Sequence, residues 1–137
     1  MRKLHLNLFR GWFDMMYKLL KTEEYRAVTS HWCSMFLLFD GGVESRTWWD
    51  FYLIERDAQD ILSKIGGQIT FRNYDSIIFS NGYAKDRPQF EIELKSIKIA
   101  EGKPEWGAED GVKYFVLELG EIKEEPKIWS KNAKLRG

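Results

Sequence analysis

The sequence predicts a single α+β domain that contains a small β-barrel, and two observations carry this prediction. Segments with helical spacing are concentrated before residue 67, whereas short alternating segments joined by turn residues follow one another after it. The length of 137 residues and the apolar content of 44 % suit one domain with one hydrophobic core.

The first predicted element is a strand. In "KLHLNLF" three leucines alternate with polar residues, so one face is expected to be buried while His5 faces outward. Gly11 ends this strand. Apolar residues then recur at helical spacing, which predicts a first helix over Trp12–Leu20.

Two further helices are predicted before residue 67. The stretch "KTEEYRAV" indicates a turn into an extended strand, after which Thr29 or Ser30 caps a short second helix. Thr47 caps a longer third helix, which Gly66–Gly67 ends. The apolar stripe of this third helix comprises Trp48, Phe51, Tyr52, Ile54, Ala58, Ile61, Leu62 and Ile65.

Strands dominate the rest of the chain. Short β segments are predicted around Ile69–Phe71 and Ile77–Phe79, and Asn81–Gly82 is typical of the tight turn of a hairpin. "PQFEIELKSIKIAEG" alternates apolar with charged residues, and "KYFVLELGEI" predicts a last strand. Residues 123–137 form a charged tail.

The charge is balanced overall but not along the chain. Residues 1–36 carry six basic and three acidic side chains, residues 37–122 carry ten and sixteen, and residues 123–137 carry five and two. A protein that binds long nucleic-acid duplexes without sequence preference requires an excess of basic side chains, which this chain lacks. A local basic groove for a short strand or a single nucleotide stays open. Because 15 % of the residues are aromatic, some rings are expected to line a groove or a partner surface.

The content of cysteine and histidine bounds the chemistry. One cysteine excludes an internal disulfide, and two histidines provide no zinc-binding spacing, so neither a metal nor a cofactor is expected. Cys33 is expected to pack in the core rather than to act as a nucleophile. No apolar run reaches the roughly 18 residues of a membrane span, and no secretory signal is recognisable. We therefore expect a cytoplasmic protein with no membrane partner.

The hexapeptide "KTEEYR" is the candidate site. In an extended strand Glu24 and Arg26 share one face about 7 Å apart, which places a carboxylate beside a permanent cation. Lys21 lies at the helix exit. Burial against Trp12 or Tyr83 would make it a candidate base or nucleophile, whereas pairing with Glu24 would oppose this. A solvated edge after the helix is the structural alternative.

Lys21, Glu24 and Arg26 have the spacing of the signature G-x-K-x-x-E-x-R, and the chain resembles ASCH domains, a branch of the PUA-like superfamily. "FSNGYAKDRPQFEIELKSIKI" and "GKPEWG…YFVLELGEI" are similar to strands of small phage- and prophage-type ASCH proteins. The resemblance covers residues 3–122 and is weakest over 36–67, which we interpret as a helical insertion within one domain. The signature glycine is Leu19 here, a residue that disfavours a positive φ and would narrow the cleft entrance.

The resemblance implies a PUA-like barrel of five to six strands with flanking helices, and a cleft at the motif that binds RNA or a modified nucleotide. Lys21 and Arg26 would contact phosphate or carbonyl groups, Glu24 a base edge, and aromatic rings would stack on bases. The predicted nucleic-acid-binding residues are Lys21, Arg26, Trp12, Asn81, Tyr83 and Lys85.

Two other functions stay open. The resemblance also extends to a branch that hydrolyses acetylated cytidine and to reported ribonucleases, so the chain could be a small hydrolase with Lys21 and Glu24 as catalytic residues. That branch has a threonine where Glu24 stands. The third hypothesis is an interaction protein whose helical insertion, with Trp48–Trp49, docks a protein partner.

Overall fold

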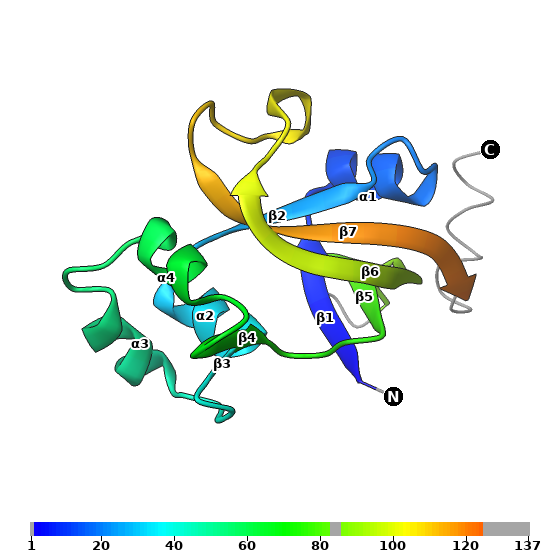
Figure 1. The fold of residues 1–137 in the computed structure, drawn as a ribbon. Coiled ribbons are helices and arrows are strands. Elements are labelled where there is room, and N and C mark those ends of the chain that lie inside the picture. Colours follow the sequence, from blue (N-terminus) through cyan, green and yellow to red (C-terminus); the bar gives the residue numbers. More distant parts are fainter. Residues whose placement is uncertain (1, 83–85, 125–137) are drawn as a thin grey trace. The chain divides into compact units, whose positions relative to one another are not determined.

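The computed structural model describes residues 2–82 and 86–124, which form a mixed α+β fold (Figure 1). A five-stranded sheet has the order β1-β5-β6-β7-β2, and β3 and β4 form a second, two-stranded sheet. The α+β class with a small five-stranded sheet is therefore confirmed. A closed PUA-like barrel stays a prediction, because β1 and β2 stand at the two ends of the strand order. Most of the predicted tail, residues 125–137, lies outside the described residues.

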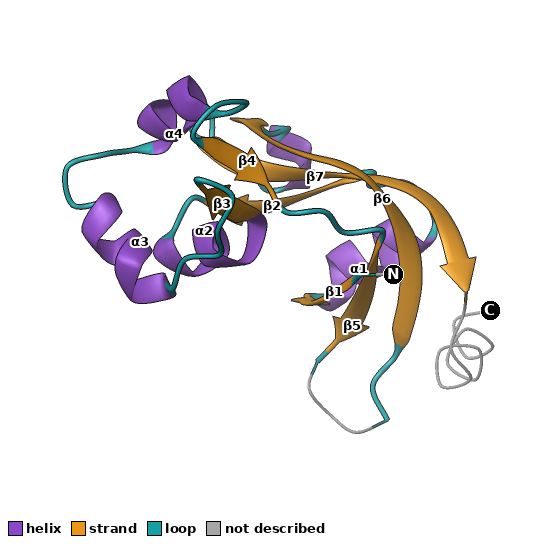
Figure 2. Ribbon diagram, turned by 60° about the horizontal axis from the view of Figure 1, so that its bottom comes forward, coloured by secondary structure: helices purple, strands orange, loops and turns teal. Residues whose placement is uncertain are grey.

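Figure 2 distinguishes the helices from the strands of the described residues. The helices are α1 (Arg10–Tyr17), α2 (Ser30–Phe36), α3 (Arg46–Tyr52) and α4 (Ala58–Lys64), with a 3-10 turn η1 (Pro104–Trp106). The strands are β1 (Lys3–Leu8), β2 (Glu23–Ala27), β3 (Leu37–Phe39), β4 (Ile69–Phe71), β5 (Ser76–Asn81), β6 (Gln89–Glu101) and β7 (Lys113–Glu124).

The chain forms two compact units, each made of segments that are distant in sequence. The first unit comprises Met1–Glu24, Tyr74–Ser96 and Glu118–Gly137, and the second comprises Tyr25–Asn73 and Ile97–Leu117. The segment predicted as a helical insertion, residues 36–67, belongs wholly to the second unit.

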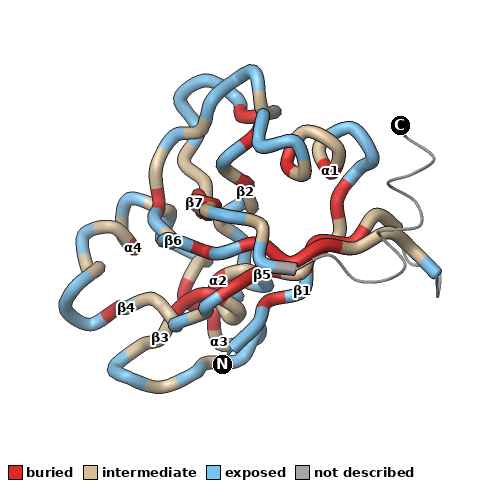
Figure 3. Tube along the Cα trace, turned by 90° about the vertical axis from the view of Figure 1, so that its right-hand side faces the viewer, coloured by how far each residue is buried: buried red, intermediate tan, exposed pale blue. Residues whose placement is uncertain are grey.

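The first unit is built on β1, β5 and α1. β1 runs parallel to β5, which pairs antiparallel with β6. The three leucines of β1 are buried and His5 is exposed, as the alternation predicts. Figure 3 shows how buried and exposed residues are distributed along the elements. Phe13 and Met16 of α1 are buried as well, and the ring of Phe13 meets that of Phe90 edge-on at 5.0 Å. The apolar face of β1, which the alternation predicts, therefore forms one side of this core.

Helix α1 ends earlier than its apolar spacing predicts. The predicted helix is present, but its predicted end at Leu20 is wrong because the helix stops at Tyr17. The N–H of Leu19 donates to the carbonyl of Met16 and that of Leu20 to the carbonyl of Met15, which is the hydrogen-bond pattern of a Schellman motif. Leu19 takes the left-handed position of that motif with φ 59°. The expectation that a leucine here avoids positive φ is therefore wrong, and Leu19 is 52 % exposed instead of packed.

Replacing Leu19 by glycine is expected to stabilise the protein. A left-handed non-glycine residue costs about 1–2 kcal/mol, and the extra backbone entropy of glycine cancels about half of the gain. Leu19→Gly should raise the free energy of unfolding in urea by about 0.5–1 kcal/mol. Leu20→Gly is the matched control: Leu20 is also exposed but has no positive φ, so that variant should be destabilised. Destabilisation by both variants would contradict the strain at Leu19.

The second unit contains α2, α3 and α4. Of the two predicted caps of α2, Thr29 and Ser30, the N-cap is Thr29, whose hydroxyl accepts a hydrogen bond from the N–H of Trp32. The single long third helix is wrong, because two helices, α3 and α4, occupy that stretch. Ser45 rather than Thr47 caps α3. Asp57 caps α4 in a reciprocal capping box with Asp60, which starts a new helix where the stripe suggested continuity.

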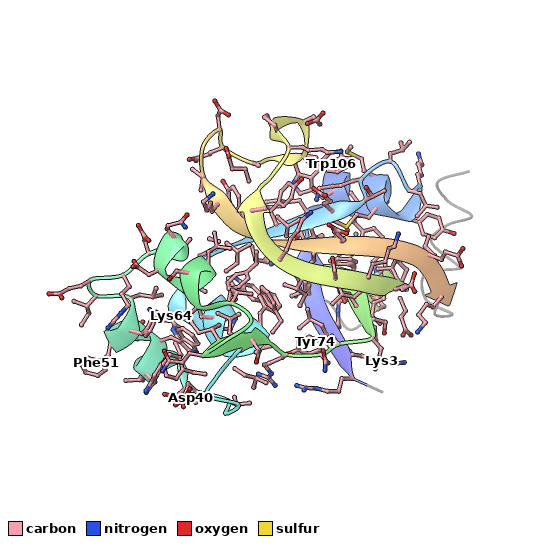
Figure 4. All side chains as sticks on the ribbon, viewed as in Figure 1. Lys3, Asp40, Phe51, Lys64, Tyr74 and Trp106 are labelled. Carbon is pink, nitrogen blue, oxygen red and sulfur yellow. The ribbon has the colours of Figure 1, made fainter. Side chains whose placement is uncertain are left out.

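The apolar stripe of the predicted third helix is also corrected. Phe51 is 71 % exposed and points away from α3 in Figure 4, and Ile54 is exposed as well. Trp49, which lay outside the stripe, is fully buried. Its ring meets those of Phe39 and Tyr52 edge-on. Tyr52 of the stripe is buried as predicted, so the core-facing side of α3 includes Trp49 and Tyr52 but not Phe51.

The hairpin between β5 and β6 is wider than its turn signal suggests. β5 ends at Asn81 and β6 begins at Gln89, so the tight turn predicted at Asn81–Gly82 is wrong. The N–H of Asn81 donates to the carbonyl of Pro88 at 3.0 Å, which closes the base of a longer loop. Gly82 has the positive φ, 88°, for which glycine is suited.

Candidate functional site

The turn after α1 determines where Lys21 lies. The Schellman motif ends α1, and the N–H of Lys21 donates to the carbonyl of Met15 at 3.2 Å. Strand β2 begins two residues further on, at Glu23. The chain therefore leaves the helix along a short path that is fixed by hydrogen bonds, and Lys21 stands at its centre.

Lys21 forms a buried ion pair with Glu24. The Nζ atom of Lys21 lies 3.1 Å from Oε1 of Glu24 and also donates to the backbone carbonyl of Glu23. The same Nζ lies 5.4 Å from the centroid of the Trp12 ring. Lys21 is 1 % exposed and Glu24 is 7 % exposed, so neither belongs to a solvated edge. The two alternatives drawn from the sequence, burial against Trp12 and pairing with Glu24, occur together.

The arrangement suits a fixed charge better than a reactive amine. An ammonium that donates to a carboxylate and to a carbonyl has no lone pair to offer as a base or nucleophile. Taking both charges out of water is costly, so a buried pair contributes more to defining the local geometry than to net stability. Lys21 therefore orients the carboxylate of Glu24, the more exposed member of the pair.

Arg26 belongs to the second unit, where Trp32 holds it. The Cζ atom of Arg26 lies 5.0 Å from the centroid of the Trp32 ring, and that ring stacks on Phe36 with an interplanar angle of 14°. A guanidinium over an indole is a favourable cation–π arrangement. Trp32 was not among the predicted site residues. Its place one turn from the cap of α2 carried no signal that it would meet Arg26.

The remaining predicted nucleic-acid-binding residues are divided by the structure. Trp12 is half-buried and carries the Lys21 ammonium on its ring. Asn81 is half-buried, and its side-chain amide donates to the carbonyl of Leu8 at 3.2 Å. The amide group of Asn81 is thus committed to holding the ends of β1 and β5 together. Tyr83 and Lys85 lie outside the described residues.

A second polar cluster in the first unit was missed by the sequence analysis. The hydroxyl of Ser76 donates to Oε2 of Glu91 at 2.5 Å, and Nζ of Lys3 lies 3.1 Å from Oε1 of the same carboxylate. These hydrogen bonds, that from Ser76 first, hold the pKa of Glu91 below its ordinary value although burial opposes the shift. The cluster joins β1, β5 and β6. Because Ser76 is fully buried, its hydroxyl is not an exposed nucleophile.

The low pKa of Glu91 makes stability depend on pH. Because the folded-state pKa lies below the ordinary 4.5, the stabilisation is present above about pH 4.5 and is lost as the pH falls through the folded value. Ser76→Ala should lower the free energy of unfolding by about 1–3 kcal/mol near neutral pH and flatten its decline in acid.

Urea unfolding as a function of pH measures this effect. Ser80→Ala is the control, since Ser80 is a buried serine of the same strand that meets the neutral side chain of Gln89. An unchanged acid slope in Ser76→Ala would contradict the role of its hydroxyl.

Cys33 is not a reactive thiol. Burial raises its pKa to about 12, so the thiolate is not formed near neutral pH. Its expected role in packing is confirmed by its full burial in α2.

Among residues 2–82 and 86–124, no group of three histidine, cysteine, aspartate or glutamate side chains could hold a metal ion. None of the helices in these ranges is long and apolar enough to span a membrane.

Comparison with protein-family models, with curated proteins and with solved structures gave no match for this chain. The resemblance to ASCH domains therefore depends on the signature residues and on the sequence around them.

Proposed function

We propose that this chain is an ASCH/PUA-like domain that binds RNA or a modified nucleotide at the motif of Lys21, Glu24 and Arg26. The observation that carries the proposal is the geometry of the motif's first half. A left-handed residue at position 19 is followed by a buried ion pair between Lys21 and Glu24.

Position 19 supports the resemblance in physical terms. The signature has glycine there, and glycine is the residue that enters the left-handed region without steric cost. Leu19 has φ 59° in spite of its side chain. The backbone of this chain thus takes the conformation for which a glycine in the signature would be suited, and the departure from the signature leaves the turn in place.

Binding is favoured over hydrolysis by the hydrogen bonds of the Lys21 side chain. A lysine that acts as base or nucleophile needs a neutral amine, and here the amine faces a carboxylate and a carbonyl that stabilise its charge. In the proposed roles Lys21 orients Glu24, the carboxylate of Glu24 accepts from a base edge, and Arg26 contacts a phosphate or carbonyl oxygen. The ring of Trp12 borders the ligand.

The test of binding uses a short, fluorescently labelled RNA and measures anisotropy at increasing salt. Loss of one charged contact is worth about 1.5–3 kcal/mol, so Arg26→Ala should weaken binding about 10- to 150-fold. Arg56→Ala is the matched control, because the Arg56 guanidinium likewise lies over an aromatic ring, that of Tyr52, at 4.6 Å. Equal effects of the two variants, or binding that ignores salt, would contradict the proposed site.

The hydrolase is tested in parallel. The wild-type chain is incubated with acetylated cytidine, other modified nucleosides and short RNAs, and the products are followed by mass spectrometry. The binding proposal predicts no product. Release of acetate or cleavage of RNA that is lost in Glu24→Gln would favour the hydrolase instead.

A further inference from the structure

The N-terminus of α1 carries an aromatic residue that neither folding nor helix capping explains. Phe9 is 81 % exposed and occupies the N-cap of α1 without forming a side-chain cap. N-cap positions favour serine, threonine, aspartate or asparagine, and large aromatic side chains are usually at least partly buried. Residues that break local rules in this way are concentrated at functional sites.

The surroundings of Phe9 in the first unit have the chemistry of a nucleic-acid surface. Phe9 directly follows Leu8, which pairs with Asn81 at the common end of the parallel strands β1 and β5. Trp12 follows three residues later on the first turn of the helix, and its ring carries the ammonium of Lys21. An exposed ring therefore precedes the short helix whose Trp12 contacts the ammonium of the proposed motif.

The charge around Phe9 decides which partner fits. Residues 9–20 contain two basic side chains, Arg10 and Lys18, and one acidic side chain, Asp14. Lys21 is buried in its ion pair with Glu24 and adds no charge to this surface. The carboxylate of Asp14 is already paired with Nε of Arg10 at 3.3 Å. Arg10 and Lys18, near the two ends of α1, are exposed to solvent. Two exposed cations on a helix that begins with an exposed aromatic ring suit a flexible polyanion that offers planar groups, which is the chemistry of single-stranded nucleic acid.

We propose that Phe9 is a stacking platform for a base of single-stranded RNA, next to the nucleotide held at the Lys21–Glu24 motif. The inference rests on the proposed function and extends it from one nucleotide to a strand that continues along α1. The exposed ring is retained at the N-cap because stacking requires a π-face that a capping residue cannot supply.

The experiment separates a role in binding from a role in folding by three variants of Phe9. Loss of one stacked base weakens binding about 5- to 150-fold, so Phe9→Ala should raise the Kd for a labelled oligouridylate within that range. Phe9→Trp should retain the affinity. Phe9→Ser should weaken binding as alanine does, yet raise Tm by about 2–6 °C, because serine supplies the missing cap.

Phe51→Ala is the matched control, since Phe51 is an exposed phenylalanine of the second unit. It should leave the affinity unchanged. Wild-type affinity in Phe9→Ala, while the wild-type chain binds and Arg26→Ala does not, would overturn the stacking platform and leave the proposed function standing. That result would point to a protein partner for the exposed ring. Absence of binding by the wild-type chain at low salt would overturn both proposals.

Discussion

A Lys21→Met variant is expected to lose about 3–5 kcal/mol of its free energy of unfolding, because it leaves the carboxylate of Glu24 without its cation in a buried position. Methionine preserves most of the apolar stem of the side chain, so the loss reports on charge and not on volume. The side chain of Lys21 is completely buried, and Nζ bonds to two oxygen atoms. Urea unfolding monitored by circular dichroism measures the loss.

The control is an exposed ion pair in the same unit. Arg10 and Asp14 are joined at 3.3 Å, close to the 3.1 Å of the buried pair, but both side chains are reached by solvent. Arg10→Met should cost only about 0.2–0.5 kcal/mol. The double variant Lys21→Met/Glu24→Leu should lose less than the sum of its single variants, with a coupling of about 1–3 kcal/mol. Additive losses would show that the two side chains act independently, which would contradict the ion pair between them.

The second large effect is expected at Trp49. The ring of Trp49 is fully buried and makes edge-on contacts at 5.0 Å to Trp48 and 5.2 Å to Tyr52. Trp49→Ala should therefore lower the free energy of unfolding by about 3–5 kcal/mol. Phe51→Ala, on the same helix, should cost less than about 0.5 kcal/mol because that ring is exposed.

This pair of variants separates the structure from the sequence pattern, which placed Phe51 and not Trp49 in the apolar stripe. A larger loss of unfolding free energy for Phe51→Ala than for Trp49→Ala would contradict this orientation of α3. Trp49→Phe adds a finer test. The indole N–H of Trp49 is buried and forms no hydrogen bond within the described ranges. Removing that donor offsets part of the lost packing, so Trp49→Phe should cost less than half as much as Trp49→Ala.

How much of the fold could be predicted follows from how far each signal reaches along the chain. The alternation in β1 and the cap at Thr29 involve residues within a few positions of one another, and both are confirmed. The start of α4 could also have been predicted, since Asp57 and Asp60 form the two halves of a capping box. The apolar stripe outweighed this signal in the sequence analysis, and the long third helix was the result.

The end of α1 illustrates the opposite case. Leu19 and Leu20 continue the helical spacing of apolar residues, and nothing in their side chains stops a helix. A glycine at position 19 would have predicted the end of the helix. Leucine at this position gives no such signal, although the turn still forms. The buried residues of α1 are Phe13 and Met16, whereas Leu19 and Leu20, beyond its end, are exposed.

The sequence by itself determined the elements whose signals are local: the alternating strands, the capped helix α2 and the order of acidic and basic groups in "KTEEYR". Tertiary structure alone decided which charges are buried. The hydrogen bond from Lys3 to Glu91 joins residues 88 positions apart. The strand order β1-β5-β6 that brings them together cannot be predicted from either segment alone. Local patterns state which face of a strand or helix is apolar. The partner that covers that face, and hence the burial of Lys21, Glu24 and Trp49, depends on pairing between distant segments of the chain.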